Sequence, residues 1–107
     1  MIVKVIRGTW TVWIQETKQL NIELEDGRIL GVRQMEDDNG AESYFQLKEA
    51  GEEIYRKGGW KKLDEVEWKD QEEKEMGEKI AYNLFYGDFE DGQIIDTDSL
   101  ESLDDFA

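Results

Sequence analysis

The feature that most constrains the fold is an Asp-Gly pair between two runs of alternating residues. Apolar residues alternate with polar ones over residues 20–25, and a second apolar run follows over residues 28–33. A period of two places successive side chains on opposite faces of a β-strand. Asp26-Gly27 supplies the positive φ that a tight type I′ turn requires. The segment therefore predicts an antiparallel β-hairpin.

Further strand signals flank this hairpin. Residues 2–14 are rich in Ile, Val, Thr and Trp, and Gly8 is either a turn or a bulge within them. A second turn signal, Asp-Asp-Asn-Gly at residues 37–40, precedes another strand signal at residues 43–45. We therefore expect an antiparallel meander of four or five strands.

Two later segments have the period of an α-helix. Leu47, Ala50 and Ile54 are spaced for one face of a first helix, which Gly58-Gly59 would end. A second helix is expected after Asp70, whose spacing from Glu73 matches a capping box. Residues 64–68 read equally well as a short strand or a loop. The second helix should end near Gly87, and its apolar stripe should face the sheet: Met76, Ile80, Ala81, Leu84 and Phe85.

The predicted fold class is α+β: a meander of four to five strands, two α-helices packed on one face, and an acidic C-terminal segment. A chain of 107 residues has the size of one domain. We expect residues 1–87 to form that domain. Residues 88–107 are expected to form the acidic segment, as a hairpin or a partly ordered tail.

Acidic residues are concentrated at the C-terminal end. Residues 88–107 contain eight acidic residues and no Lys or Arg, so they carry −8 of the net charge of −14. The preceding residues hold 13 basic and 19 acidic side chains and are closer to balance. Such a segment repels phosphates and membranes and attracts basic surfaces. The eight acids are Asp88, Glu90, Asp91, Asp96, Asp98, Glu101, Asp104 and Asp105.

The start of this segment has some features of a calcium-binding loop. Aligning Gly92 with the invariant glycine of an EF-hand loop places Gly87 and Phe89 at ligand positions, and neither has a side-chain oxygen. We expect a hairpin turn at Asp91-Gly92 and no metal site.

Enzyme chemistry has little support in the sequence. The chain has no Cys and no His, which removes thiolates and the side chain that titrates nearest neutrality. Four acids cluster near one turn, Glu36, Asp37, Asp38 and Glu42, but a turn tip is solvated and does not separate their pKa values. We expect no enzyme and no cofactor, and keep a small carboxylate-based catalytic or metal-binding protein as the alternative from another class.

Membrane and export signals are also lacking. No apolar run approaches the roughly 18 residues of a membrane span, and the first residues lack the apolar region of a signal peptide. We expect a soluble, cytoplasmic protein that does not bind membranes.

One basic run, residues 56–62, contains Trp60 between Arg and Lys residues. A Trp flanked by cations can stack on a nucleic-acid base, but a net charge of −14 opposes binding to phosphates. We expect no direct nucleic-acid binding. Instead, we expect the acidic C-terminal segment to lie against this run.

The function predicted from these features is binding without catalysis. We expect a small acidic protein that blocks a basic, nucleic-acid-binding protein, with the eight C-terminal acids as contacts and Leu103 and Phe106 as apolar anchors. In size and charge the chain resembles DNA mimics and anti-defence inhibitors of phage or mobile elements, in which carboxylates stand in for phosphates. An immunity protein against a basic nuclease toxin is the alternative that would use the same electrostatics.

Overall fold

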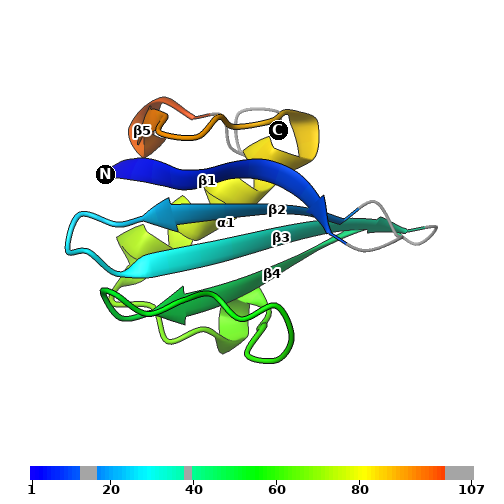
Figure 1. Cartoon of the computed structure of the whole chain (residues 1–107), viewed down its shortest axis with the longest axis horizontal. Helices are drawn as coiled ribbons and strands as arrows, with labels where there is room; N and C mark the ends of the chain where they lie inside the picture. Colours follow the sequence, from blue (N-terminus) through cyan, green and yellow to red (C-terminus); the bar gives the residue numbers. More distant parts are fainter. Residues whose placement is uncertain (13–16, 38–39, 101–107) are drawn as a thin grey trace.

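Five antiparallel strands and one α-helix make up the part of the chain that the computed structural model describes, residues 1–12, 17–37 and 40–100. The strands form one sheet in the order β4-β3-β2-β1-β5, so β1 to β4 are a meander and β5 returns beside β1 (Figure 1). The predicted meander is therefore confirmed. The strands are β1 (Ile2–Val12), β2 (Thr17–Glu23), β3 (Ile29–Asp37), β4 (Gly40–Lys48) and β5 (Ile94–Asp96).

The hairpin between β2 and β3 forms at Asp26-Gly27, as the sequence predicts. The Gly27 N–H donates to the carbonyl of Leu24 at 3.0 Å, and the Leu24 N–H donates to the carbonyl of Arg28 at 2.9 Å. Gly27 has a φ of 89°, the left-handed conformation that glycine adopts without steric cost. The loop has three residues rather than the two of a type I′ turn, a common form that ends on a left-handed glycine.

A single helix, α1 (Gln71–Tyr86), covers one face of the sheet (Figure 1). Asp70 caps it, because its side chain accepts a hydrogen bond from the Glu73 N–H at 2.9 Å. Met76, Ile80 and Leu84 are at most 2% exposed, as predicted from their spacing. They pack against apolar side chains from four strands: Val3, Val5, Leu20, Ile22, Leu30, Val32 and Phe45.

Phe85 does not share this burial. It is only half-buried, although its spacing from Ala81 predicts the core. Side chains at the edge of the buried face of a helix point partly sideways rather than straight toward the sheet. Phe85 lies at such a margin and lines a cavity beside Tyr86.

The predicted first helix is absent. β4 continues through Leu47 to Lys48, and a turn follows in which the Glu52 N–H donates to the Glu49 carbonyl at 3.1 Å. Gly51 has a φ of 83°, which interrupts any helix at this point. Leu47 packs toward the core under α1, whereas Ile54 contacts Gly31 on the other side of the sheet. The residues assigned to one helical face therefore lie on opposite faces of the sheet.

Residues 49–60 cover part of the sheet face that α1 leaves open. The Gln46 side chain holds this segment: its Oε1 accepts from the Tyr55 N–H at 2.6 Å and its Nε2 donates to the Gly58 carbonyl at 3.0 Å. Ile54 and Trp60 sit directly over Gly31, where an added Cβ would lie 2.9–3.0 Å from their atoms. The absence of a side chain at Gly31 thus allows the segment to approach the sheet.

The chain then crosses the free edge of β4 and returns to the helical side. Lys61 pairs with Phe45 through backbone hydrogen bonds of 2.7 and 2.8 Å. The segment at residues 64–68, which the sequence leaves open, is a short 3-10 turn, η1 (Leu63–Glu65), followed by a loop. The Trp68 ring packs edge-on against Phe45 with their centroids 5.5 Å apart.

The C-terminal segment runs along the outer side of β1. The carbonyls of Phe89 and Gln93 accept backbone hydrogen bonds from β1, and Ile94–Asp96 forms β5. Asp91-Gly92 forms a turn, in which the Gln93 N–H donates to the Glu90 carbonyl at 3.1 Å. The expected turn is therefore present, but it does not join two paired strands, because the residues on either side of it also bond to β1. A second 3-10 turn, η2 (Thr97–Ser99), follows.

Candidate functional site

The predicted contact residues that the structure describes lie along one edge of the sheet. Residues 88–98 follow the outer side of β1 from Thr9 to Met1 (Figure 1), so their carboxylates are distributed along this edge. We call these residues the acidic edge: Asp88, Glu90, Asp91, Asp96 and Asp98, all of which are exposed.

Local bonds fix several of these carboxylates in place. Asp88 pairs with Lys18 Nζ at 3.1 Å, and Asp98 pairs with the N-terminal amine at 3.3 Å. Asp91 accepts a hydrogen bond from the Gly8 N–H, and Asp96 accepts one from the Asp98 N–H at 3.0 Å. These positions are therefore set by the fold rather than by a free chain end, which lowers the entropy lost when a partner binds.

The other predicted contacts lie outside the described residues. Glu101, Leu103, Asp104, Asp105 and Phe106 belong to this group. Leu100, the last described residue, packs against the apolar core.

Exposed isoleucines accompany the acidic edge, and sequence reasoning missed them. Ile2, Ile6 and Ile94 are 45%, 43% and 61% exposed. Ile94 pairs with Lys4, which lies between Ile2 and Ile6 on β1, so the three isoleucines surround one position on the face opposite α1. We call them the isoleucine patch. Their β-branched side chains predict a strand, but the sequence does not show that these three side chains are exposed.

The basic run does not contact the acidic edge, so the expected intramolecular pairing does not form for residues 88–98, and residues 101–107 lie outside the described part of the chain. Residues 56–62 lie beside β4, whereas residues 88–98 lie beside β1 and β5 at the opposite edge of the sheet (Figure 1). Trp60 is half-buried, and the Arg33 guanidinium stacks on it 4.1 Å from the ring centroid. This ring is therefore already engaged within the fold.

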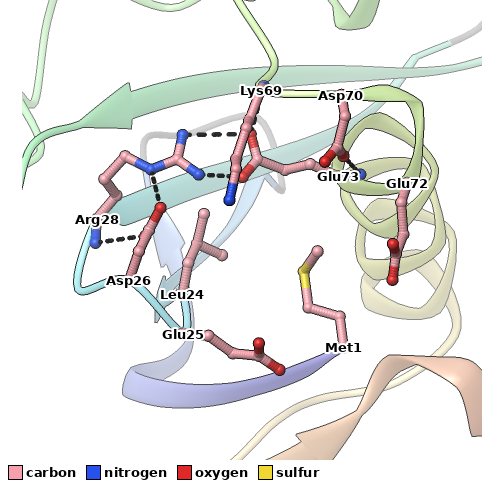
Figure 2. Close-up of a pocket in the computed structure, with 9 residues that line it drawn as sticks. All are labelled: Met1, Leu24, Glu25, Asp26, Arg28, Lys69, Asp70, Glu72 and Glu73. Atoms are coloured by element: carbon pink, nitrogen blue, oxygen red, sulfur yellow. Dashed lines mark hydrogen bonds and ion pairs between the residues drawn. The ribbon is translucent and has the colours of Figure 1, made fainter.

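A buried ion pair joins the β2–β3 loop to the start of α1. Glu73 is 2% exposed, and both of its carboxylate oxygens accept hydrogen bonds from the Arg28 guanidinium. Glu73 also accepts from the Lys69 N–H at 2.9 Å, and Asp26 accepts from Arg28 Nε at 2.7 Å. Figure 2 shows the Arg28 side chain extended toward Glu73, with Asp26 beside it. The capping-box spacing pointed to Glu73, but its ion partner is 45 residues away.

This network borders a cavity of about 450 Å³ that Glu25, Asp70 and Glu72 also line. The hydrogen bonds that Arg28 donates to Glu73 raise the pKa of Arg28 above its ordinary value, and the hydrogen bond that Arg28 donates to Asp26 lowers the pKa of Asp26. A general base near neutral pH needs a raised carboxyl pKa, which is the opposite direction. Within the described residues, no group of three or more carboxylates is placed to hold a metal ion. The geometry therefore points to a structural role.

The acids around the β3–β4 turn form no described site. Asp38 and the side chains of Glu36 and Asp37 lie outside what the structure describes. Glu42 is exposed and accepts a hydrogen bond from the Tyr44 hydroxyl at 2.6 Å.

A second cavity lies between the C-terminal half of α1 and the sheet. It has a volume of about 390 Å³ and is lined mainly by aromatic and apolar side chains. The lining includes Phe45, Leu63, Tyr82, Phe85 and Tyr86, with Glu78 among the polar residues. The sequence predicts a helical stripe here but contains no sign of a cavity.

Comparisons with known proteins give no family for this chain. No protein-family model matches it, and neither a curated protein nor a solved structure matches it. None of the helices in the described ranges is long and apolar enough to span a membrane.

Proposed function

We propose that this chain is a small binding protein that blocks a basic, nucleic-acid-binding protein through its acidic edge. The observation that carries the proposal is the position of the isoleucine patch beside carboxylates of that edge. Asp96 pairs with Ile2 across β1 and β5, and Ile94 lies two residues before Asp96. A protein interface commonly combines apolar and polar groups, and this surface offers isoleucines around the exposed Lys4 with carboxylates beside them.

The two parts of the surface would act at different stages of binding. Carboxylates at the rim attract a basic surface before contact and raise the association rate. Exposed isoleucines lose water only once the partner is seated, so they slow dissociation. Carboxylates placed where a nucleic acid would place phosphates would compete for the same basic groups. A nuclease toxin is one partner with this chemistry.

The test is capture of partners from a host lysate on the immobilised full chain at low and high salt. A specific partner should be retained at low salt and released as the screening length falls toward roughly 3 Å at 1 M. The recovered partner is then mixed with labelled DNA or RNA, and the chain should displace the nucleic acid from it.

Charge-matched variants make this test specific. Glu90→Gln with Asp98→Asn removes two charges from the acidic edge, and Glu53→Gln with Glu75→Gln removes two exposed charges elsewhere. The first variant should slow association by more than the second, and Ile94→Ser should speed dissociation. If both charge variants weaken binding equally, the acidic edge is not the recognition surface. A partner that still binds nucleic acid fully in the complex would refute the blocking role.

A further inference from the structure

The aromatic cavity under the end of α1 combines three features that favour the same kind of ligand. Its walls include the rings of Phe45, Tyr82, Phe85 and Tyr86. The Tyr86 ring centroid lies 5.0 Å from that of Tyr82 and 4.9 Å from that of Phe85, so the three rings form one cluster. Aromatic faces carry partial negative charge and attract cations.

The one charged residue among the described lining of the cavity is acidic. Glu78 lines it and is exposed, and none of the described residues in its lining is Lys or Arg. Two further cavities among the described residues differ, because Arg28 and Lys69 line one, and Arg28, Lys48 and Lys61 line the other. The aromatic cavity therefore has a carboxylate at its wall without a cation in the wall to neutralise it.

The helix adds a third contribution. The carbonyl end of a helix is equivalent to about half a negative charge, which cations in the last turn usually offset. The last turn of α1 contains no basic residue. Lys18 reaches the Leu84 carbonyl at 3.2 Å, but the same amine is also paired with Asp88. The field at this end of α1 thus favours a further positive charge.

We propose that this cavity binds the guanidinium group of an arginine side chain presented by another protein. A planar guanidinium can stack on an aromatic ring and still donate hydrogen bonds to a carboxylate, which an ammonium cannot do as well. The chain itself packs arginines in this way, with Arg7 3.6 Å from the centroid of Trp10 and Arg33 4.1 Å from that of Trp60. This inference goes beyond the proposed function and does not depend on the acidic edge.

The experiment is an NMR titration of the full-length, isotope-labelled protein with N-acetyl-arginine amide. The matched probe is N-acetyl-citrulline amide, which has the same shape as the arginine probe but no charge. The arginine probe should shift amide signals of residues 78–86 in a saturable way and bind more tightly than the citrulline probe. Signals of residues 26–28, beside the cavity at the start of α1, should move little.

Three variants separate this cavity from general attraction to an acidic protein. Tyr86→Ala and Glu78→Gln should each weaken the arginine probe about two- to fivefold, the range of one cation–π contact or exposed ion pair. Glu75→Gln removes the same charge as Glu78→Gln from the same helix, outside the cavity lining, and should change affinity less. All three altered side chains are exposed, so the variants should keep the native spectrum elsewhere.

Equal binding of the two probes would overturn the proposal. So would signal shifts that are spread over all acidic residues and that stay the same in the Tyr86→Ala variant. The result is independent of partner capture. An arginine-binding cavity without a retained partner would leave this inference standing and remove the proposed function. If acidic-edge variants alone fail to retain the partner and the arginine probe does not bind, the proposed function stands and this inference is removed.

Discussion

Replacing Arg28 with Ala should destabilise the protein more than any exposed charge substitution. Glu73 is 2% exposed and receives hydrogen bonds on both oxygens from Arg28. Without Arg28, the backbone N–H of Lys69, at 2.9 Å, is the one donor to these oxygens that remains among the contacts described here. Leaving a buried charge without its partner costs about 3–5 kcal/mol.

This cost is large compared with the stability of a small domain. A native domain is stable by about 5–15 kcal/mol, so the variant loses a substantial fraction of its free energy of unfolding. The expected fall in Tm is roughly 10–25 °C for a chain of this size. Urea unfolding followed by tryptophan fluorescence measures the loss, and an unchanged m-value would show that the folded state keeps its compactness.

A double variant separates the lost pair from other effects of the substitution. Arg28→Met with Glu73→Leu replaces both charges by apolar groups, and such replacements are often neutral or stabilising. The double variant should therefore recover most of the loss. If Arg28→Ala alone costs less than about 1 kcal/mol, water from the adjoining cavity of about 450 Å³ must solvate the Glu73 carboxylate. That result would refute the conclusion that the Arg28–Glu73 ion pair is shielded from water.

Three further predictions concern the core, the pH dependence and the segment over the open face. Leu84→Ala should cost about 2–5 kcal/mol in urea unfolding because Leu84 is fully buried, whereas Tyr86→Ala at a 70% exposed site should stay within about 0.5 kcal/mol. Arg28 holds the pKa of Asp26 below 3.8, so Asp26 stabilises the fold above pH 3.8 and loses this effect as the pH falls below it. Asp26→Asn should therefore reduce the loss of stability on the acidic side of a stability–pH curve. Gln46→Ala removes the side-chain hydrogen bonds to Tyr55 and Gly58, so amide hydrogen exchange should accelerate over residues 52–60 while α1 stays protected. Equal acceleration throughout the protein would contradict a local role for Gln46.

The parts of the fold that the sequence predicts are those fixed by near neighbours. The β2–β3 hairpin depends on Gly27 and on alternation within a few residues of it. The start of α1 depends on Asp70 and Glu73, which lie within one helical turn. In both cases the interacting groups are close in the chain, so a local pattern contains the information.

The predicted first helix failed because its apolar residues are used at long range. Leu47 packs under α1, and Ile54 packs over Gly31 on the other face. The spacing of Leu47, Ala50 and Ile54 is compatible with a helix, but it does not show that two of these residues have different packing partners. Gly51 was the one local signal against a helix, since it can adopt a left-handed conformation.

The candidate surfaces depend still more on pairing between distant residues. The concentration of acids in residues 88–98 is visible in the sequence, but their alignment along β1 requires contacts such as Val3 with Ile95. The same pairing leaves Ile2 and Ile94 uncovered. The aromatic cavity likewise combines Phe45 from β4 with Tyr86 from α1, and neither residue type indicates a cavity by itself.

Separation of charge across the sheet gives the proposed complex a preferred orientation. The acidic edge lies beside β5, and the basic run at residues 56–62 lies beside β4, with three strands between these edges. A screening length of about 10 Å at 0.1 M salt allows a partner to sense the nearer edge before contact. The bases of residues 56–62 offset acids beside β4, so a basic partner would be attracted more strongly toward β5. Since the isoleucine patch adjoins β5, this orientation would bring apolar groups of the partner to Ile94. Charge would then determine the association rate and the orientation of the partner, and burial of apolar groups would determine the lifetime of the complex.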